Sequence, residues 1–139
     1  MKVHHDSSRF LVRFERGEAI PDTLVTLAKE RGWMSGSLLG IGGVQDVMLA
    51  YFDLHTKSYM QIPVEGIVEL ISLSGNLAFV DGQPLWHMHA AVSDVKGRVT
   101  AGHLVSLKVA VTLECWITPS HDVVTRSRDE FSGLNLLAI

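Results

Sequence analysis

The chain has 139 residues, of which 47% are hydrophobic and 19% charged, and its formal net charge is −3 at pH 7. These values predict one well-packed globular domain and exclude intrinsic disorder. The negative net charge argues against a nucleic-acid-binding domain as a whole, although two groups of arginines leave a local basic patch open: Arg9, Arg13 and Arg16, and Arg126 and Arg128.

Two classes of targeting segment are not expected. No apolar run approaches the roughly 20 residues of a membrane span, so we expect no membrane partner. The N-terminus carries no apolar h-region of a secretory signal, and the only cysteine is Cys115, which is compatible with a reducing compartment. We therefore expect a cytoplasmic protein.

The first part of the chain predicts a tail, a strand and a helix. Residues 1–8 are expected to form a polar N-terminal tail ahead of a single domain over residues 9–139. Residues 9–16 predict a strand because apolar residues alternate there, with an inward face of Phe10, Val12 and Phe14. Residues 20–32 predict the one main helix, which begins near a proline and ends at a glycine.

The middle of the chain predicts more strands. The cluster Gly40-Ile41-Gly42-Gly43 is followed neither by a Lys-Ser/Thr pair nor by a helix, so it predicts a bulged or sharply turned strand pair within residues 37–52 and not a phosphate loop. Residues 59–64 contain a proline near their end and predict an edge strand. Residues 66–80 predict one long strand, or two with a kink at Gly75.

Glu69 lies in apolar company within this segment. We expect it to share a face with Ile67, Ile71, Leu73, Leu77 and Phe79. A carboxylate in such a place needs a partner or a raised pKa. Two interpretations stay open: a general acid/base or a carboxylate near a metal, and a structural glutamate held by an ion pair or by backbone groups.

Three histidines form the most informative pattern. Asp81-Gly82 predicts a hairpin turn into a strand over residues 85–92, where the period of two puts His87 and His89 on one face. A second turn, over residues 94–97, is expected to return His103 to that face. His4 and His5 are expected to be solvated, and neither His55 nor His121 has a comparable pattern.

Three neutral imidazole nitrogens that converge on one point make a metal site. Zinc is favoured because it accepts imidazole readily and takes three protein ligands plus water in open sites. The spacing leaves iron, nickel, copper and manganese open. The alternative is that His87 and His89 are partly buried strand residues and that His103 lies near them by chance.

The last third of the chain predicts a long strand and a final segment. Residues 104–116 alternate, with an expected inward face of Val105, Leu107, Val109, Val111 and Leu113. Cys115 continues this alternation and predicts a buried, unreactive thiol. Pro119 is expected to close the strand, and residues 134–139 to supply a last strand or a packing tail.

Several motifs in this order resemble the PPC (plants and prokaryotes conserved) domain family: Phe14-Glu-Arg-Gly17, Glu69-Leu-Ile-Ser-Leu-Ser-Gly-Asn76, Trp86-His-Met-His89, Gly97-Arg98 and Ala101-Gly-His-Leu104. The resemblance covers about Arg9 to Leu137. It implies an α+β fold with a strongly bent, mostly antiparallel β-sheet and one main α-helix. It also implies a homotrimer and a metal, usually taken as zinc, at His87, His89 and His103.

The resemblance implies more than one function. Plant members that are similar to this domain carry a Gly-Arg-Pro AT-hook for DNA, whereas this chain has neither that tripeptide nor a basic extension. The fold also looks related to that of acetolactate decarboxylase, whose zinc is similarly held by a His-x-His pair and a later histidine.

The first hypothesis is therefore a homotrimeric metal-binding module with a DNA-binding or regulatory role. The second is a zinc-dependent enzyme, lyase-like or decarboxylase-like, that acts on a small molecule with Glu69 as acid/base. The third is a purely structural metal that holds the histidine hairpin together.

Overall fold

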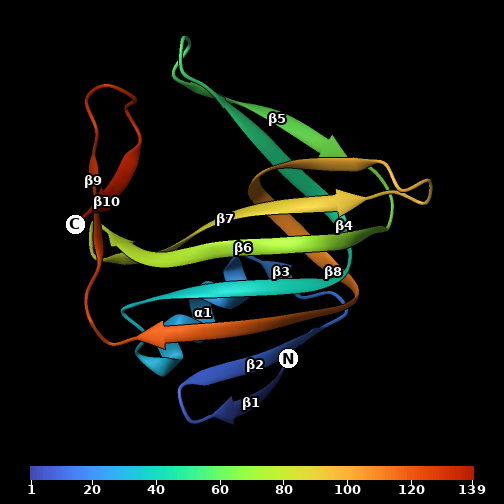
Figure 1. Cartoon of the computed structure of the whole chain (residues 1–139), viewed down its shortest axis with the longest axis horizontal. Helices are drawn as coiled ribbons and strands as arrows, with labels where there is room; N and C mark the ends of the chain where they lie inside the picture. The colour runs from blue at the N-terminus through green and yellow to red at the C-terminus, as the bar shows by residue number, and fades with distance from the viewer.

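The computed structural model describes residues 1–139 and is mainly β, with ten strands and one helix (Figure 1). The elements in chain order are β1 (Lys2–Asp6), β2 (Arg9–Glu15), β3 (Ala19–Ile20), α1 (Asp22–Arg31), β4 (Ser35–Asp53), β5 (Ser58–Val64), β6 (Val68–Val80), β7 (Gln83–Ser93), β8 (Val99–Ser120), β9 (Thr125–Arg128) and β10 (Asn135–Ala138). The single helix keeps the fold within the expected α+β class. No helix in the structure is both long and apolar enough to cross a membrane.

All strands belong to one sheet, which curls back on itself. The main path runs β1-β2-β8-β4-β6-β9-β10, with β3 on β8, β5 on β4, and β7 between β6 and β8. Strands β4, β6, β7 and β8 each pair with the next in a closed circuit. The pairing is antiparallel apart from one parallel bridge between β6 and β9. Residues 99–103 of β8 pair with β7, and residues 112–117 pair with β2, so the expected strong bend is present.

The core is one continuous cluster of buried side chains inside this curled sheet. Helix α1, which lies behind the strands in Figure 1, buries Leu24 and Leu27 against it. The indole Nε1 of Trp86 donates a hydrogen bond to the Leu24 carbonyl oxygen at 3.3 Å, which links α1 to β7. The helix ends at Gly32, whose φ of 65° is the left-handed conformation of a C-terminal cap.

Most expected elements are confirmed. Strand β2 buries its alternating apolar residues, α1 begins after Pro21, and β5 pairs only with β4 as an edge strand. The turn between β6 and β7 uses Asp81 and Gly82, both at positive φ. The glycine-rich segment has the expected bulge, a register shift between Gly40 and Gly42, but it lies in one long strand, β4, and not in a strand pair. The chain ends in the expected last strand, β10.

The expected N-terminal tail is instead a strand. Residues 2–6 form β1, which pairs antiparallel with β2, and Val3 packs against the core. The two histidines of this strand, His4 and His5, are exposed as expected. Val3 is one apolar residue among polar neighbours, so the segment has no periodic pattern that would predict a strand. The strand depends on its backbone pairing with β2.

Two long strands also differ from the expected patterns. In β8, Val105 and Val111 are exposed rather than inward, because the register between β4 and β8 shifts in several places and each shift resets the alternation. The strand also continues past the expected stop to Ser120. In β6 the irregularity lies between Leu70 and Ser72, not at Gly75.

Candidate metal centre

Strands β7 and β8 bring the three predicted histidines together. His87 and His89 point from the same face of β7, and His103 of β8 is the direct partner of His89 across the ladder. The connecting turn is fixed by Asp94, whose Oδ1 accepts hydrogen bonds from the backbone N–H groups of Lys96 at 2.8 Å and of Arg98 at 3.0 Å. The register of the hairpin therefore sets the spacing of the rings.

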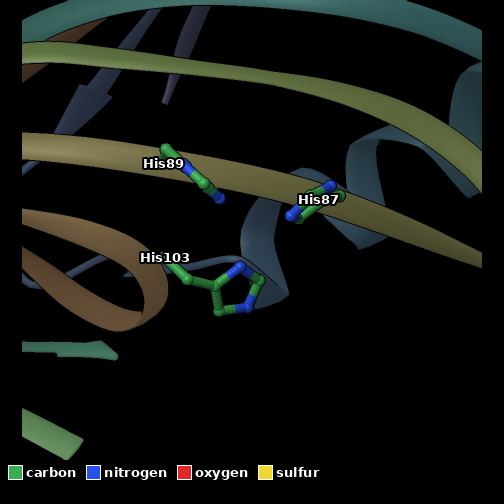
Figure 2. Close-up of side chains that lie close together, drawn as sticks. All are labelled: His87, His89 and His103. Atoms are coloured by element: carbon green, nitrogen blue, oxygen red, sulfur yellow. The ribbon is translucent and has the colours of Figure 1, made fainter. Parts of the chain in front are cut away.

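The rings form a compact group. Figure 2 shows the two imidazoles of β7 and that of His103 turned towards a common point. One ring nitrogen from each residue lies within 4.8 Å of the other two. The ring centroid of His87 lies 5.2 Å from that of His89 and 5.1 Å from that of His103. The ring centroids of His89 and His103 are 5.7 Å apart. The structure thus brings together every residue of the expected ligand set.

The surroundings favour neutral rings. Burial lowers the pKa of His87 to about 4, with further lowering by the charge of Arg126 and by the neighbouring histidines. Burial also lowers the pKa of His103, with a smaller effect of His89. Since a metal ligand must be an unprotonated imidazole, both rings are ready to coordinate at neutral pH.

One atom of the group lacks a partner. The Nδ1 of His103 is buried and makes no hydrogen bond. A buried polar atom without a partner is rare in folded proteins and calls for an explanation such as an ion. Three imidazoles with no carboxylate or thiol among them form a donor set that suits Zn²⁺ and related transition metals.

Arg126 of β9 lies beside the three histidines, and the sequence pattern did not predict this. Its Nη2 donates to Asn76 Oδ1 at 2.6 Å and lies 3.4 Å from His87 Nδ1, and its Nη1 donates to the Asn135 carbonyl oxygen at 3.0 Å. Burial lowers the pKa of this guanidinium, and Tyr59 opposes the shift. Arginine and histidine are 39 positions apart in the chain, so only the fold brings them together.

A cavity of about 540 Å³ opens next to the rings, and all three histidines line it. The other lining residues are mostly apolar or aromatic and none is acidic: Ala50, Tyr51, Phe52, Tyr59, Leu85, Gly102, Leu134, Asn135 and Leu136. The ring of Tyr59 lies 5.0 Å from that of His103. A cavity of this size is within the range that holds small-molecule ligands.

Glu69 is not part of this group. It is exposed and lines a separate groove of about 380 Å³ together with Ile41, Gly42, Gly43, Leu70, Ile71, Val111, Thr112 and Glu114. On β6 it lies five residues before Ser74, the ladder partner of His89, which is roughly 16 Å along an extended strand. Ile67 and Ile71 share its exposed face as expected, whereas the bulge after Leu70 turns Leu73 and Leu77 to the buried one.

The remaining candidates are ordinary structural residues. Cys115 is buried, and burial raises its pKa to about 12, as expected of an unreactive thiol. The arginines of β2 do not form a patch of one sign, because Arg9 lies 3.5 Å from Asp6 and Arg13 lies 3.3 Å from Glu15.

The family model of the Plants and Prokaryotes Conserved (PCC) domain matches residues 1–121, most of the chain. The chain belongs to this family. It is the same family that the sequence motifs resemble. The matched range contains all three histidines but ends before β9 and β10. No curated protein matches the sequence.

Solved structures agree with the membership. A PPC protein from Pyrococcus horikoshii is 29% identical, with a TM-score of 0.87 over 99% of this chain and 94% of its own. A proposed DNA-binding protein from Bacteroides thetaiotaomicron is 26% identical, with a TM-score of 0.93 over 98% of this chain and 95% of its own. A metal-containing protein from Archaeoglobus fulgidus is 28% identical, with a TM-score of 0.87 over 99% of this chain and 96% of its own.

Proposed function

We propose that this PPC domain is a metal-binding module that holds one divalent transition-metal ion, zinc by preference, through His87, His89 and His103. The observation that carries the proposal is the convergence of three ring nitrogens to within 4.8 Å. The unpartnered Nδ1 of His103 and the neutral rings support it. The similar protein from Archaeoglobus fulgidus, which is described as metal-containing, agrees with it.

The cavity favours an open site over a structural one. The cluster contains no fourth histidine, cysteine or carboxylate, and structural zinc sites are normally closed by four protein ligands. A bound metal would supply Lewis-acid chemistry, so a zinc-dependent lyase or decarboxylase acting on a small molecule in the cavity is the alternative function. Glu69 plays no part in this proposal within one subunit, because it lines a different groove.

Elemental analysis of the untagged protein tests the metal proposal. We expect about one zinc per chain in the parent, and loss of that metal in His87→Ala and His103→Ala. His121→Ala is the matched control, because His121 is exposed and lies outside the cluster. Absence of metal from the parent after zinc supplementation would contradict the proposal, as would equal metal content in all four proteins.

We also propose that the chain forms the homotrimer that the family resemblance implies. An exposed apolar face supports this: Leu39 and Trp116 are direct ladder partners, and Ile41, Ile71 and Val111 continue the face around the Glu69 groove. Monomeric proteins rarely leave large contiguous apolar surfaces exposed.

Light scattering after size exclusion tests the assembly. We expect a mass of three times the 15.3 kDa chain, and a smaller mass for Ile41→Asp. Val95→Asp is the control, because Val95 is also apolar and is even more exposed, but lies in the turn between β7 and β8. A parent protein that is monomeric at micromolar concentration would contradict the assembly.

A role at DNA is the second candidate function, and it rests on the description of the similar protein from Bacteroides thetaiotaomicron. Fluorescence anisotropy with a labelled AT-rich duplex tests it at low and at physiological salt, because electrostatic binding weakens steeply with salt. Saturable binding that survives physiological salt would support this role. No binding at low salt would contradict this role, and metal binding would then be the only proposed function that remains.

A further inference from the structure

The Arg126 guanidinium is a partly buried cation without a counter-ion. None of the ion pairs in the structure involves it, and its acceptors are the amide oxygen of Asn76, the carbonyl of Asn135 and the ring of His87. Its Nε is buried and unpartnered. Because buried charges are normally paired, this arginine has unused capacity to bind an anion.

Metal binding would increase that capacity. A neutral imidazole has one nitrogen with a lone pair and one that carries a proton. If His87 bound a metal through Nδ1, that lone pair would be used, and if it bound through Nε2, the proton would move to Nδ1. Either way His87 Nδ1 could no longer accept from Arg126, so a guanidinium N–H beside the cluster would lose its acceptor.

The charge of such a loaded site is not balanced by the protein. A divalent ion on three neutral imidazoles and the cation of Arg126 would together have three positive charges, while no acidic side chain lines the cavity. Excess positive charge in a partly buried site attracts an anion from solution.

We propose that the cavity beside His87, His89 and His103 binds a small organic carboxylate with an apolar body, and that the unbalanced charge of Arg126 attracts its carboxylate group to the metal position. Arg126 does not line the cavity itself but lies behind two lining residues, since its Nη1 donates to the Asn135 carbonyl oxygen and its Nη2 lies 3.4 Å from His87 Nδ1. This inference rests on the proposed metal-binding function and names the ligand class of the same site. The apolar body follows from the walls, where Phe52, Leu85, Leu134 and Leu136 lie on the lining. Arg126 lies beyond the residues that match the family model.

Calorimetric titration of the zinc-loaded protein with three probes of equal chain length tests this ligand class. The probes are hexanoate, hexylamine and hexanol, which share an apolar chain and differ in charge. We expect hexanoate to bind and the other two to bind at least about tenfold more weakly. Equal binding of the amine or the alcohol would overturn the proposed preference for an anion, and so would absence of hexanoate binding to the loaded protein.

Variants of two arginines on β9 test the role of Arg126. Arg126→Met should weaken hexanoate binding at least about tenfold, whereas Arg128→Met removes the same charge from an exposed neighbour and should leave binding unchanged. Arg126→Lys keeps the charge and should bind hexanoate more tightly than Arg126→Met does. Equal hexanoate affinity in Arg126→Met and the parent would overturn the assignment.

Elemental analysis of the same samples distinguishes a failure of the proposed metal site from a failure of the proposed ligand class. Loss of hexanoate binding with about one zinc still bound per chain is the expected result for Arg126→Met. About one zinc per chain in both proteins, together with equal hexanoate affinity, contradicts only this inference. A parent chain that holds no zinc contradicts the proposed function, and this inference fails with it.

Discussion

The two ends of β6 lie beside two different kinds of surface. In its second half, Asn76 contacts Arg126 and is the ladder partner of His87, so polar groups from three strands meet beside the histidine cavity. Near its start, Glu69 lines an exposed groove among apolar side chains, with Glu114 of β8 as a second acid. The histidine end of β6 therefore lies beside neutral imidazoles and a guanidinium cation, whereas the Glu69 end lies beside two carboxylates.

This separation has a physical consequence. Neutral imidazoles are suited to a transition metal. A cavity without acidic side chains does not repel an anionic ligand. The groove has no cluster of metal-binding groups, and its exposed apolar residues suit contact with a second copy of the chain. Experiments that perturb one end should therefore leave the other end unchanged.

The largest effect on stability is expected in the groove. A Cβ on Gly42 would overlap the carbonyl oxygen of Thr112 and lie 2.8 Å from the Cα of Leu113, so β4 and β8 would have to separate. We expect Gly42→Ala to lower the free energy of unfolding by about 2–3 kcal/mol. In Gly43→Ala the new Cβ would meet only the exposed side chain of Val111, and we expect a loss under about 1 kcal/mol. Denaturant unfolding measures both, and equal losses would contradict the close approach.

A smaller effect is expected at the histidine end when the pH changes in the metal-free protein. His87 titrates near pH 4 in the folded chain and near 6.5 when unfolded. The unfolded state therefore binds more protons between these values, and stability falls as the pH drops from 6.5 towards 4. We expect a loss of about 1–2 kcal/mol, since the ring is partly exposed and solvent screens the effect.

The matched variant for this pH dependence is His87→Gln, which cannot titrate there. Denaturant unfolding of both metal-free proteins at pH 6.5 and pH 4.5 isolates the contribution of the one ring. The parent should lose more stability than the variant. The same loss in both proteins would mean that other groups cause it.

The smallest effect is expected from Glu69→Gln. Because Glu69 lines the groove and not the histidine cavity, metal content and zinc affinity should stay within about twofold of the parent. Zinc titration of the two proteins in parallel measures this. A tenfold fall in affinity would show that the two ends of β6 are coupled, for example through contact between copies.

Much of the site could be predicted because its signals are local. The period of two in β7 placed His87 and His89 on one face, and the turn after β7 returned His103 to them. The helix and β2 were equally clear, since an alternation or a capping residue lies within a few positions of what it controls. These features depend on short stretches of sequence.

The remaining features depend on contacts between distant strands. The exposed position of Val111 follows from register shifts between β4 and β8, and the distance of Glu69 from the histidines follows from how β6 pairs with β7. Arg126 reaches His87 only because β9 contacts β6 at one bridge, between Phe79 and Thr125. No local periodicity in one sequence encodes such pairings.

Calorimetric titration of zinc into metal-stripped protein tests the central claim most directly. We predict one zinc per chain in the parent and in a variant with both His4→Ala and His5→Ala, because these two histidines are exposed on β1, outside the cluster. His89→Ala should lose this binding. Retained one-to-one binding in His89→Ala, or its loss in the β1 variant, would contradict the account.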